Sequence, residues 1–175
     1  MATHPLVVHV TDLLRRPGAR REVQREVPLA GLVLTSSEVP EDRPVGVDLL
    51  LEAQGEQLIV EGTVWAVWTG ACRRCLEPTS GRVEARVEEV FERHPTEGET
   101  WPLTGEHVDL EPLVREAVLL ALPLAPLCGP DCLGPDPERF PATVEGVATG
   151  DEGDEPAEPP LDPRWAALEA LKFDE

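Results

Sequence analysis

Four cysteines in two close pairs are the residues of this chain best suited to chemistry. Cys72 and Cys75 form a C-x2-C pair, and Cys128 and Cys132 form a C-x3-C pair in a segment rich in Pro and Gly. Two thiolates at such a spacing can grip one metal ion, and zinc prefers four ligands in a tetrahedron. The cysteines are therefore candidate zinc ligands, provided that the fold joins two pairs separated by 52 residues.

Three interpretations of these cysteines are open. They could hold a structural zinc ion, remain reduced in the fold without a metal, or form a redox-active dithiol or disulfide. Arg73 and Arg74 would lower the pKa of a neighbouring thiol, which favours zinc ligation and thiolate reactivity alike. A thioredoxin-like site needs a helix after its C-x2-C motif, whereas a β segment follows here, so the redox interpretation is the weakest.

The rest of the sequence carries no recognisable catalytic motif. It lacks a phosphate-binding glycine loop, a dinucleotide fingerprint, a nucleophile elbow and a metalloprotease helix motif. The histidines lie far from the cysteines and form no ligand-like pair: they are His4, His9, His94 and His107. We therefore expect a protein that is not an enzyme and has no small-molecule substrate.

The chain is strongly acidic, and the charge is unevenly distributed. It has 34 acidic and 15 basic residues, a net charge of -19, of which residues 91–175 carry -15 and residues 1–90 only -4. Such a chain is repelled by bulk nucleic acid, so any contact with RNA would be local. The candidate RNA-contact residues are Arg15, Arg16, Arg20, Arg21, Arg25, Arg73 and Arg74, although such arginines more often form a solvated face.

Apolar runs predict several β-strands around the first cysteine pair. The clearest alternation covers 58–68, and a half-exposed strand covers 83–91. The polar segment 11–26 is expected to be an exposed connection. Further short strands are expected at 6–10, 27–34 and 45–53.

The face of strand 58–68 that carries Trp65 and Val67 has two interpretations. It could be a platform on which RNA bases stack, or part of the core between a sheet and a helix. Because a sheet needs a second layer over its apolar face, the core is the favoured interpretation.

A helix is predicted to begin after Asp109 and to end at Pro123, with apolar residues at helical spacing. The predicted fold class is α+β: an antiparallel β meander or partly closed barrel packed against this one amphipathic helix. We expect a single domain over 1–141 that includes the Cys-bearing Pro/Gly-rich segment, an acidic disordered linker over 142–160, and a short helical segment over 161–175.

Nothing in the sequence indicates a membrane or an export signal. No run of about 18 apolar residues occurs, and the N-terminus lacks the basic start and apolar region of a signal peptide. We therefore expect a cytoplasmic protein with no membrane partner, in which the cysteines are kept reduced.

The motifs taken together resemble the bacterial YceD family of large ribosomal RNA accumulation proteins. The resemblance rests on the Cys72-x-Arg74-Cys75-Leu76 turn, on the helix from Asp109 that continues into Cys128-x3-Cys132, and on the last helix, opened by Asp162-Pro163-Arg164. It covers about residues 6 to 172. After Cys132, where many members continue with a second C-x2-C, this chain reads Leu-Gly-Pro-Asp.

The resemblance implies a non-enzymatic factor of ribosome biogenesis that supports accumulation of 23S rRNA and assembly of the large subunit. Its partner would be precursor 23S rRNA, a basic large-subunit ribosomal protein, or both. The charge of -19 favours the basic protein. The alternative function is that of a zinc-binding or thiol-redox regulatory protein unrelated to the ribosome.

Overall fold

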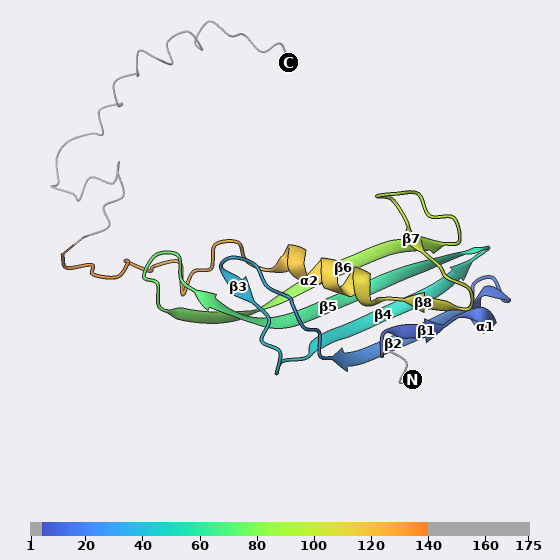
Figure 1. Cartoon of the computed structure of the whole chain (residues 1–175), viewed down its shortest axis with the longest axis horizontal. Helices are drawn as coiled ribbons and strands as arrows, with labels where there is room; N and C mark the ends of the chain where they lie inside the picture. The colour runs from blue at the N-terminus through green and yellow to red at the C-terminus, as the bar shows by residue number, and fades with distance from the viewer. Residues whose placement is uncertain (1–4, 140–175) are drawn as a thin grey trace, which may run out of the picture. The chain divides into compact units, whose positions relative to one another are not determined.

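Three long antiparallel strands dominate the computed structural model, which describes residues 5–139 (Figure 1). The expected linker 142–160 and helical segment 161–175 lie outside the described residues. The elements in chain order are β1 (Val7–His9), α1 (Thr11–Leu14), β2 (Arg20–Val27), β3 (Ser37–Glu38), β4 (Val45–Gln54), β5 (Gln57–Ala71), β6 (Pro78–Glu92), β7 (Trp101–Pro102), β8 (His107–Asp109) and α2 (Glu111–Ala121).

The main sheet has the strand order β2-β4-β5-β6-β7. Its first four strands are antiparallel, β7 adds a two-residue parallel pairing to the end of β6, and β3 pairs with the far end of β5. β1 and β8 form a separate two-stranded sheet. The α+β class and the antiparallel meander are thus confirmed. The sheet is open, because β2 and β7 do not pair with each other, so the partly closed barrel is not formed in the described chain.

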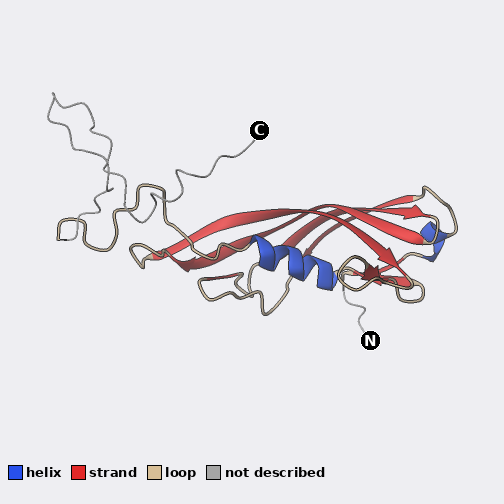
Figure 2. Cartoon of the chain, turned by 90° about the horizontal axis from the view of Figure 1, so that it is seen from above, coloured by secondary structure: helices blue, strands red, loops and turns tan. Residues whose placement is uncertain are grey.

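One face of the main sheet carries the core, and α2 packs on that face against β5 and β6 (Figure 2). In β5 the buried residues alternate, as the sequence predicts, and they include Val60, Val64 and Trp68. The other face, which we call the open face, carries Trp65 and Val67, both only half-buried. The prediction that these two residues belong to the core is therefore wrong, because α2 and the rest of the core pack on the opposite face.

The polar segment 11–26 is not the exposed connection that we expected from the sequence. It forms α1 and most of β2, an edge strand that buries Val23 and Val27 and leaves its other face exposed. The expected strand at 27–34 is instead mostly a loop. An edge strand with one solvated face needs few apolar residues, so its composition resembles that of a connection.

The predicted helix is present as α2, and it begins two residues after Asp109. The Asp109 carboxylate accepts a hydrogen bond of 2.9 Å from the backbone N–H of Glu111. Leu113, Val114 and Val118 are buried against the sheet. Within residues 5–139, neither helix has the length and apolar character needed to cross a membrane.

Gly62 allows β4 and β5 to approach closely at the centre of the sheet. Its φ is +146°, and a Cβ there would lie 2.2 Å from the backbone oxygen of Asp48. Gly55, with a φ of +65°, has nothing within 4 Å of such a Cβ.

We expect Gly62→Ala to lower the free energy of unfolding by about 3 kcal/mol or more, and Gly55→Ala by about 1 kcal/mol. Urea unfolding followed by circular dichroism measures both, and equal losses would contradict the role of close approach.

Candidate metal centre

The structure brings the four cysteines together at one end of the main sheet. Cys72 and Cys75 lie in the turn that joins β5 to β6, and Cys128 and Cys132 lie in the segment that follows α2. The Sγ atoms of Cys72 and Cys132 are 3.8 Å apart, as are those of Cys75 and Cys128, and all four lie within 4.8 Å of one another. A tetrahedron with metal–sulfur bonds of about 2.3 Å has edges of about 3.8 Å. The cluster therefore has the dimensions of a four-thiolate metal site.

The fold explains how pairs so distant in the sequence meet. After β6 the chain travels through β7 and β8, and α2 then returns along the sheet towards the β5–β6 turn. The segment after α2 is fastened there: Ser37 Oγ donates to the Pro123 carbonyl (2.8 Å), and Ser36 Oγ donates to that of Leu124 (3.0 Å). The backbone N–H of Arg73 donates to the Pro126 carbonyl (2.9 Å). These bonds deliver the second cysteine pair to the first.

The β5–β6 turn is shaped around its first cysteine. The Cys72 N–H donates to the Glu77 carbonyl, and the Leu76 N–H donates to the Cys72 carbonyl, each at 2.9 Å. The Arg74 N–H points at the Cys72 sulfur, 3.5 Å away. Leu76 closes the turn with a φ of +65°, which is rare for a bulky residue. The turn thus directs the sulfur atoms of Cys72 and Cys75 toward the same site.

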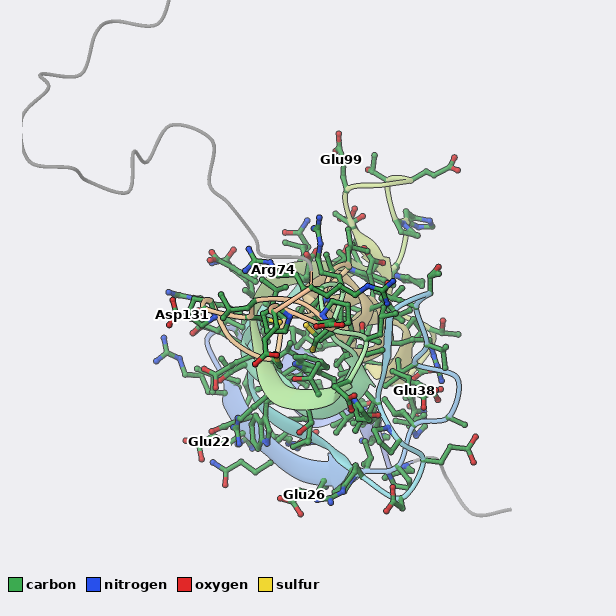
Figure 3. The ribbon with its side chains drawn as sticks, turned by 90° about the vertical axis from the view of Figure 1, so that its left-hand side faces the viewer. Glu22, Glu26, Glu38, Arg74, Glu99 and Asp131 are labelled. Atoms are coloured by element: carbon green, nitrogen blue, oxygen red, sulfur yellow. The ribbon has the colours of Figure 1, made fainter. Side chains whose placement is uncertain are left out.

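The Arg74 side chain ties the two cysteine turns together. Its guanidinium donates to the carbonyls of Pro130 (3.0 Å) and Cys132 (3.1 Å). Figure 3 looks at this end of the domain and labels Arg74 from one turn and Asp131 from the other. The sequence suggested Arg74 only as an RNA contact or a group that lowers a thiol pKa. Its structural role depends on residues more than fifty positions away, so no local pattern could reveal it.

The thiols are in very different protonation environments although they lie close together. Backbone N–H groups of Cys75 and Cys128 lower the pKa of the buried Cys72 to about 6. For Cys75, the N–H of Glu77 lowers the pKa, but burial and the Cys72 and Cys132 side chains outweigh it and the pKa is raised. The side chains of Cys132 and Cys72 help raise the pKa of Cys128 to about 12. Four sulfurs this close cannot all ionise unaided, and a divalent cation would stabilise the four thiolates.

The donor set fits a closed metal site. Within residues 5–139, these four cysteines are the one group of His, Cys, Asp or Glu side chains arranged to hold a metal ion. With all four tetrahedral positions supplied by the protein, none is left for a substrate or water. The cluster could therefore bind a metal, and such a site would hold parts of the fold together.

The candidate RNA-contact arginines are not gathered into one surface. Arg15 and Arg16 follow α1, and three others lie on β2, whereas Arg73 and Arg74 lie in the cysteine turn. The start of β2 pairs with Glu52 of β4, which in turn pairs with Ile59 of β5. Ile59 is twelve residues, or about 40 Å, along β5 from the end of the strand at the cysteine turn.

The β2 arginines also have acidic neighbours. Arg20 pairs with Glu52 at 2.8 Å, and Arg21 pairs with Asp12. Glu22 lies between Arg21 and Arg25, Glu26 directly follows Arg25, and both carboxylates point outward from β2 (Figure 3). The structure thus separates the seven residues into distant groups and lowers the positive charge of the larger one.

Arg74 and Arg73 form a matched pair for testing the link between the turns. We expect Arg74→Ala to lower the free energy of unfolding by about 1 kcal/mol, since it removes two charge-assisted hydrogen bonds at a partly solvated site. Arg73→Ala removes the same charge from an exposed side chain and should cost less than about 0.5 kcal/mol. Urea unfolding of the two variants measures the difference. Equal losses would mean that the guanidinium bridge does not stabilise the fold.

Comparison with known proteins places the chain in a family. Residues 60–172 match the family model described as "Large ribosomal RNA subunit accumulation protein YceD". Uncharacterized proteins of Mycobacterium bovis and Mycobacterium tuberculosis are each 35% identical to the chain, covering 94% of it and 80% of their own length. An uncharacterized protein of Mycobacterium leprae is 33% identical, with 94% and 76% covered. No solved structure matches significantly. The chain therefore belongs to the YceD family of large ribosomal RNA subunit accumulation proteins.

Proposed function

We propose that this protein is a non-enzymatic, cytoplasmic assembly factor that supports 23S rRNA accumulation by binding a basic ribosomal protein of the large subunit. The family description supports the link to large-subunit ribosomal RNA. The nature of the partner is inferred from the charge of the protein surface.

The observation that carries the proposal is the acidity of the part of the chain that the structure describes. Residues 5–139 contain 24 acidic residues and 13 arginines, so they carry a net charge of -11. Part of this charge lies on the open face of the sheet, where the register of the ladders places seven carboxylates and only three guanidinium groups. The acidic set is Glu22, Glu26, Asp48, Glu52, Glu61, Glu84 and Glu88, and the basic set is Arg20, Arg82 and Arg86.

An acidic surface of this kind attracts basic proteins and repels phosphate backbones. Ribosomal proteins of the large subunit must stay soluble before rRNA neutralises them, and a negative surface would steer them in quickly. Apolar side chains on the open face, such as Trp65 and Val67, would add contact area. The separation of the arginines gives precursor 23S rRNA less support as the direct partner.

We further propose that the cysteine cluster binds zinc as a structural ion. Its four-sulfur donor set and closed geometry are those that zinc favours. The ion would fasten the β5–β6 turn to the segment that follows α2. It would thereby hold the helix against the sheet from its C-terminal end.

Binding measurements with purified components test the proposed partner. We expect the full-length protein to bind at least one basic large-subunit ribosomal protein, with affinity falling about tenfold or more between 50 and 300 mM NaCl because the contact is electrostatic. Fragments of precursor 23S rRNA serve as the competing probe. Salt-dependent binding to RNA alone, weakened when Arg15, Arg16, Arg20, Arg21 and Arg25 are changed to Gln, would contradict the proposal.

Metal analysis tests the proposed zinc. Protein purified without chelator should contain about one zinc ion per chain. Cys72→Ser and Cys132→Ser should each lower that content and reduce the free energy of unfolding by about 3 kcal/mol or more, since binding energy at a structural site is folding energy. Ser80→Ala, at an exposed position of β6 that supplies no sulfur, is the control. A zinc content near zero would instead support reduced cysteines without metal.

A further inference from the structure

The outer edge of β6 is uncovered over most of its length. β6 spans 15 residues, and β5 pairs with it from Pro78 to Phe91. On its other side β7 pairs only with Phe91 and Glu92. In the part of the chain that the structure describes, no strand pairs with that side of residues 78–90 (Figure 1).

The hydrogen-bond register shows which backbone groups point outward from this edge. The Cys72 N–H donates to the Glu77 carbonyl, which makes these two residues a hydrogen-bonded pair at the start of the β5–β6 ladder. Bonded and non-bonded pairs alternate along antiparallel strands. The odd-numbered residues of β6 therefore bond to β5, and the even-numbered ones face outward. The Glu92 carbonyl fits this pattern, because it accepts the Leu103 N–H on the outer side.

A groove runs beside the edge, between β6 and α2. It has a volume of about 600 Å³, and Ala85, Val87, Leu113 and Ala117 are among its lining residues. Leu120 of α2 also lines it and is 80% exposed, so it adds accessible apolar surface to the groove.

The groove is also acidic. Its charged lining residues are Glu84, Glu88, Glu89, Glu116 and Arg86. Glu89 accepts a hydrogen bond from the Trp101 ring N–H at 3.2 Å, and the other three carboxylates are exposed. The edge thus combines free backbone donors and acceptors, an apolar lining and excess negative charge.

We propose that this edge takes up an extended segment of the basic protein partner as an added β-strand. Side chains of an added strand alternate between the two faces of the sheet. On the α2 side they would meet Ala85, Val87 and Leu120, and on the open face they would meet Glu84 and Glu88. The matching segment therefore alternates apolar residues with Lys or Arg. The inference takes the identity of the partner from the proposed function, whereas the uncovered strand edge is observed independently of it.

A proline at an outward-facing position of β6 distinguishes binding by strand addition from binding by electrostatic attraction alone. Arg86→Pro removes an outward N–H while sparing the bonds to β5, whose donors are at the odd-numbered residues. Arg86→Ala removes the same positive charge and keeps the N–H. Strand addition predicts that Arg86→Pro weakens binding of the basic ribosomal protein at least about tenfold, whereas Arg86→Ala binds as tightly as wild type or more so. Attraction alone predicts that neither variant weakens binding.

A second pair of variants leaves the sequence of β6 unchanged. Leu120→Glu places a carboxylate in the groove, and Leu124→Glu places one on an equally exposed leucine outside it (79% exposed). Simple attraction of a basic partner predicts that both variants bind slightly more tightly. Strand addition predicts that Leu120→Glu weakens binding about fivefold or more and that Leu124→Glu does not. Equal behaviour of the two variants would overturn the proposal.

Amide hydrogen exchange followed by NMR directly measures whether the outward-facing amides of β6 are hydrogen-bonded. In the free, full-length protein the amides of Arg82, Glu84, Arg86 and Glu88 should exchange faster than those of their odd-numbered neighbours. Bound partner should slow exchange at these four amides about tenfold or more. Protection already present in the free protein, from another part of the chain or from a second copy, would overturn the proposal, as would binding that leaves the four amides unprotected.

The experiment also separates failure of this inference from failure of the proposed function. If ribosomal proteins bind but the variants and the exchange pattern do not respond, the edge is not their site and the proposed function stands. If no basic ribosomal protein binds, the proposed function fails. The edge is then tested with a synthetic decapeptide of alternating Lys and Val, read by the same four amides, and absence of protection by this peptide overturns the edge proposal.

Discussion

The main constraint on this domain is that its main sheet is covered on one face only, and α2 covers only part of that face. α2 has 11 residues and is about 16 Å long, whereas β5 and β6 have 15 residues each and are about 50 Å long. Other parts of the chain therefore add buried residues to the same core, among them Leu13 of α1, Leu32 of the loop after β2 and Val108 of β8, and the opposite face stays open. The outer side of β6 is likewise left without a strand for most of its length. The domain's main candidate surfaces for partners follow from this mismatch.

The same constraint explains which parts of the fold could be predicted from sequence. The alternation in β5 and β6 and the apolar repeat of α2 come from burial on one side, and both were readable. The pattern around Trp65 and Val67 was not, because both faces of β5 are apolar at that point and only tertiary packing decides which one the helix covers. β2 was missed because an edge strand on an open sheet needs only two buried valines. Burial in such a strand leaves little trace in composition.

The cysteine cluster, too, could be predicted only in part, because its local spacing is visible in the sequence and its long-range contacts are not. Each pair has the spacing of a metal-binding turn, which the sequence displays. Their meeting depends on Ser36 and Ser37, whose hydroxyls fasten the segment after α2 to β3, and on Arg74, which joins the two turns. These contacts span 56 to 88 positions, so no spacing rule predicts them. The net charge of -19 was equally visible, but only the structure shows which of the charged residues lie on the open face.

The cluster and the uncovered edge are structurally connected, because the cluster joins the ends of the same strand and helix that border the edge. At the cluster, the turn before β6 meets the segment after α2. In the groove, the same strand and helix form the two walls, and Leu120 lies only a few residues before Pro123, which Ser37 holds. An ion that fixes the cysteine turns would therefore also fix the separation of strand and helix along the groove. In this arrangement a structural metal would serve binding indirectly, by keeping a docking edge at constant width rather than by touching the partner.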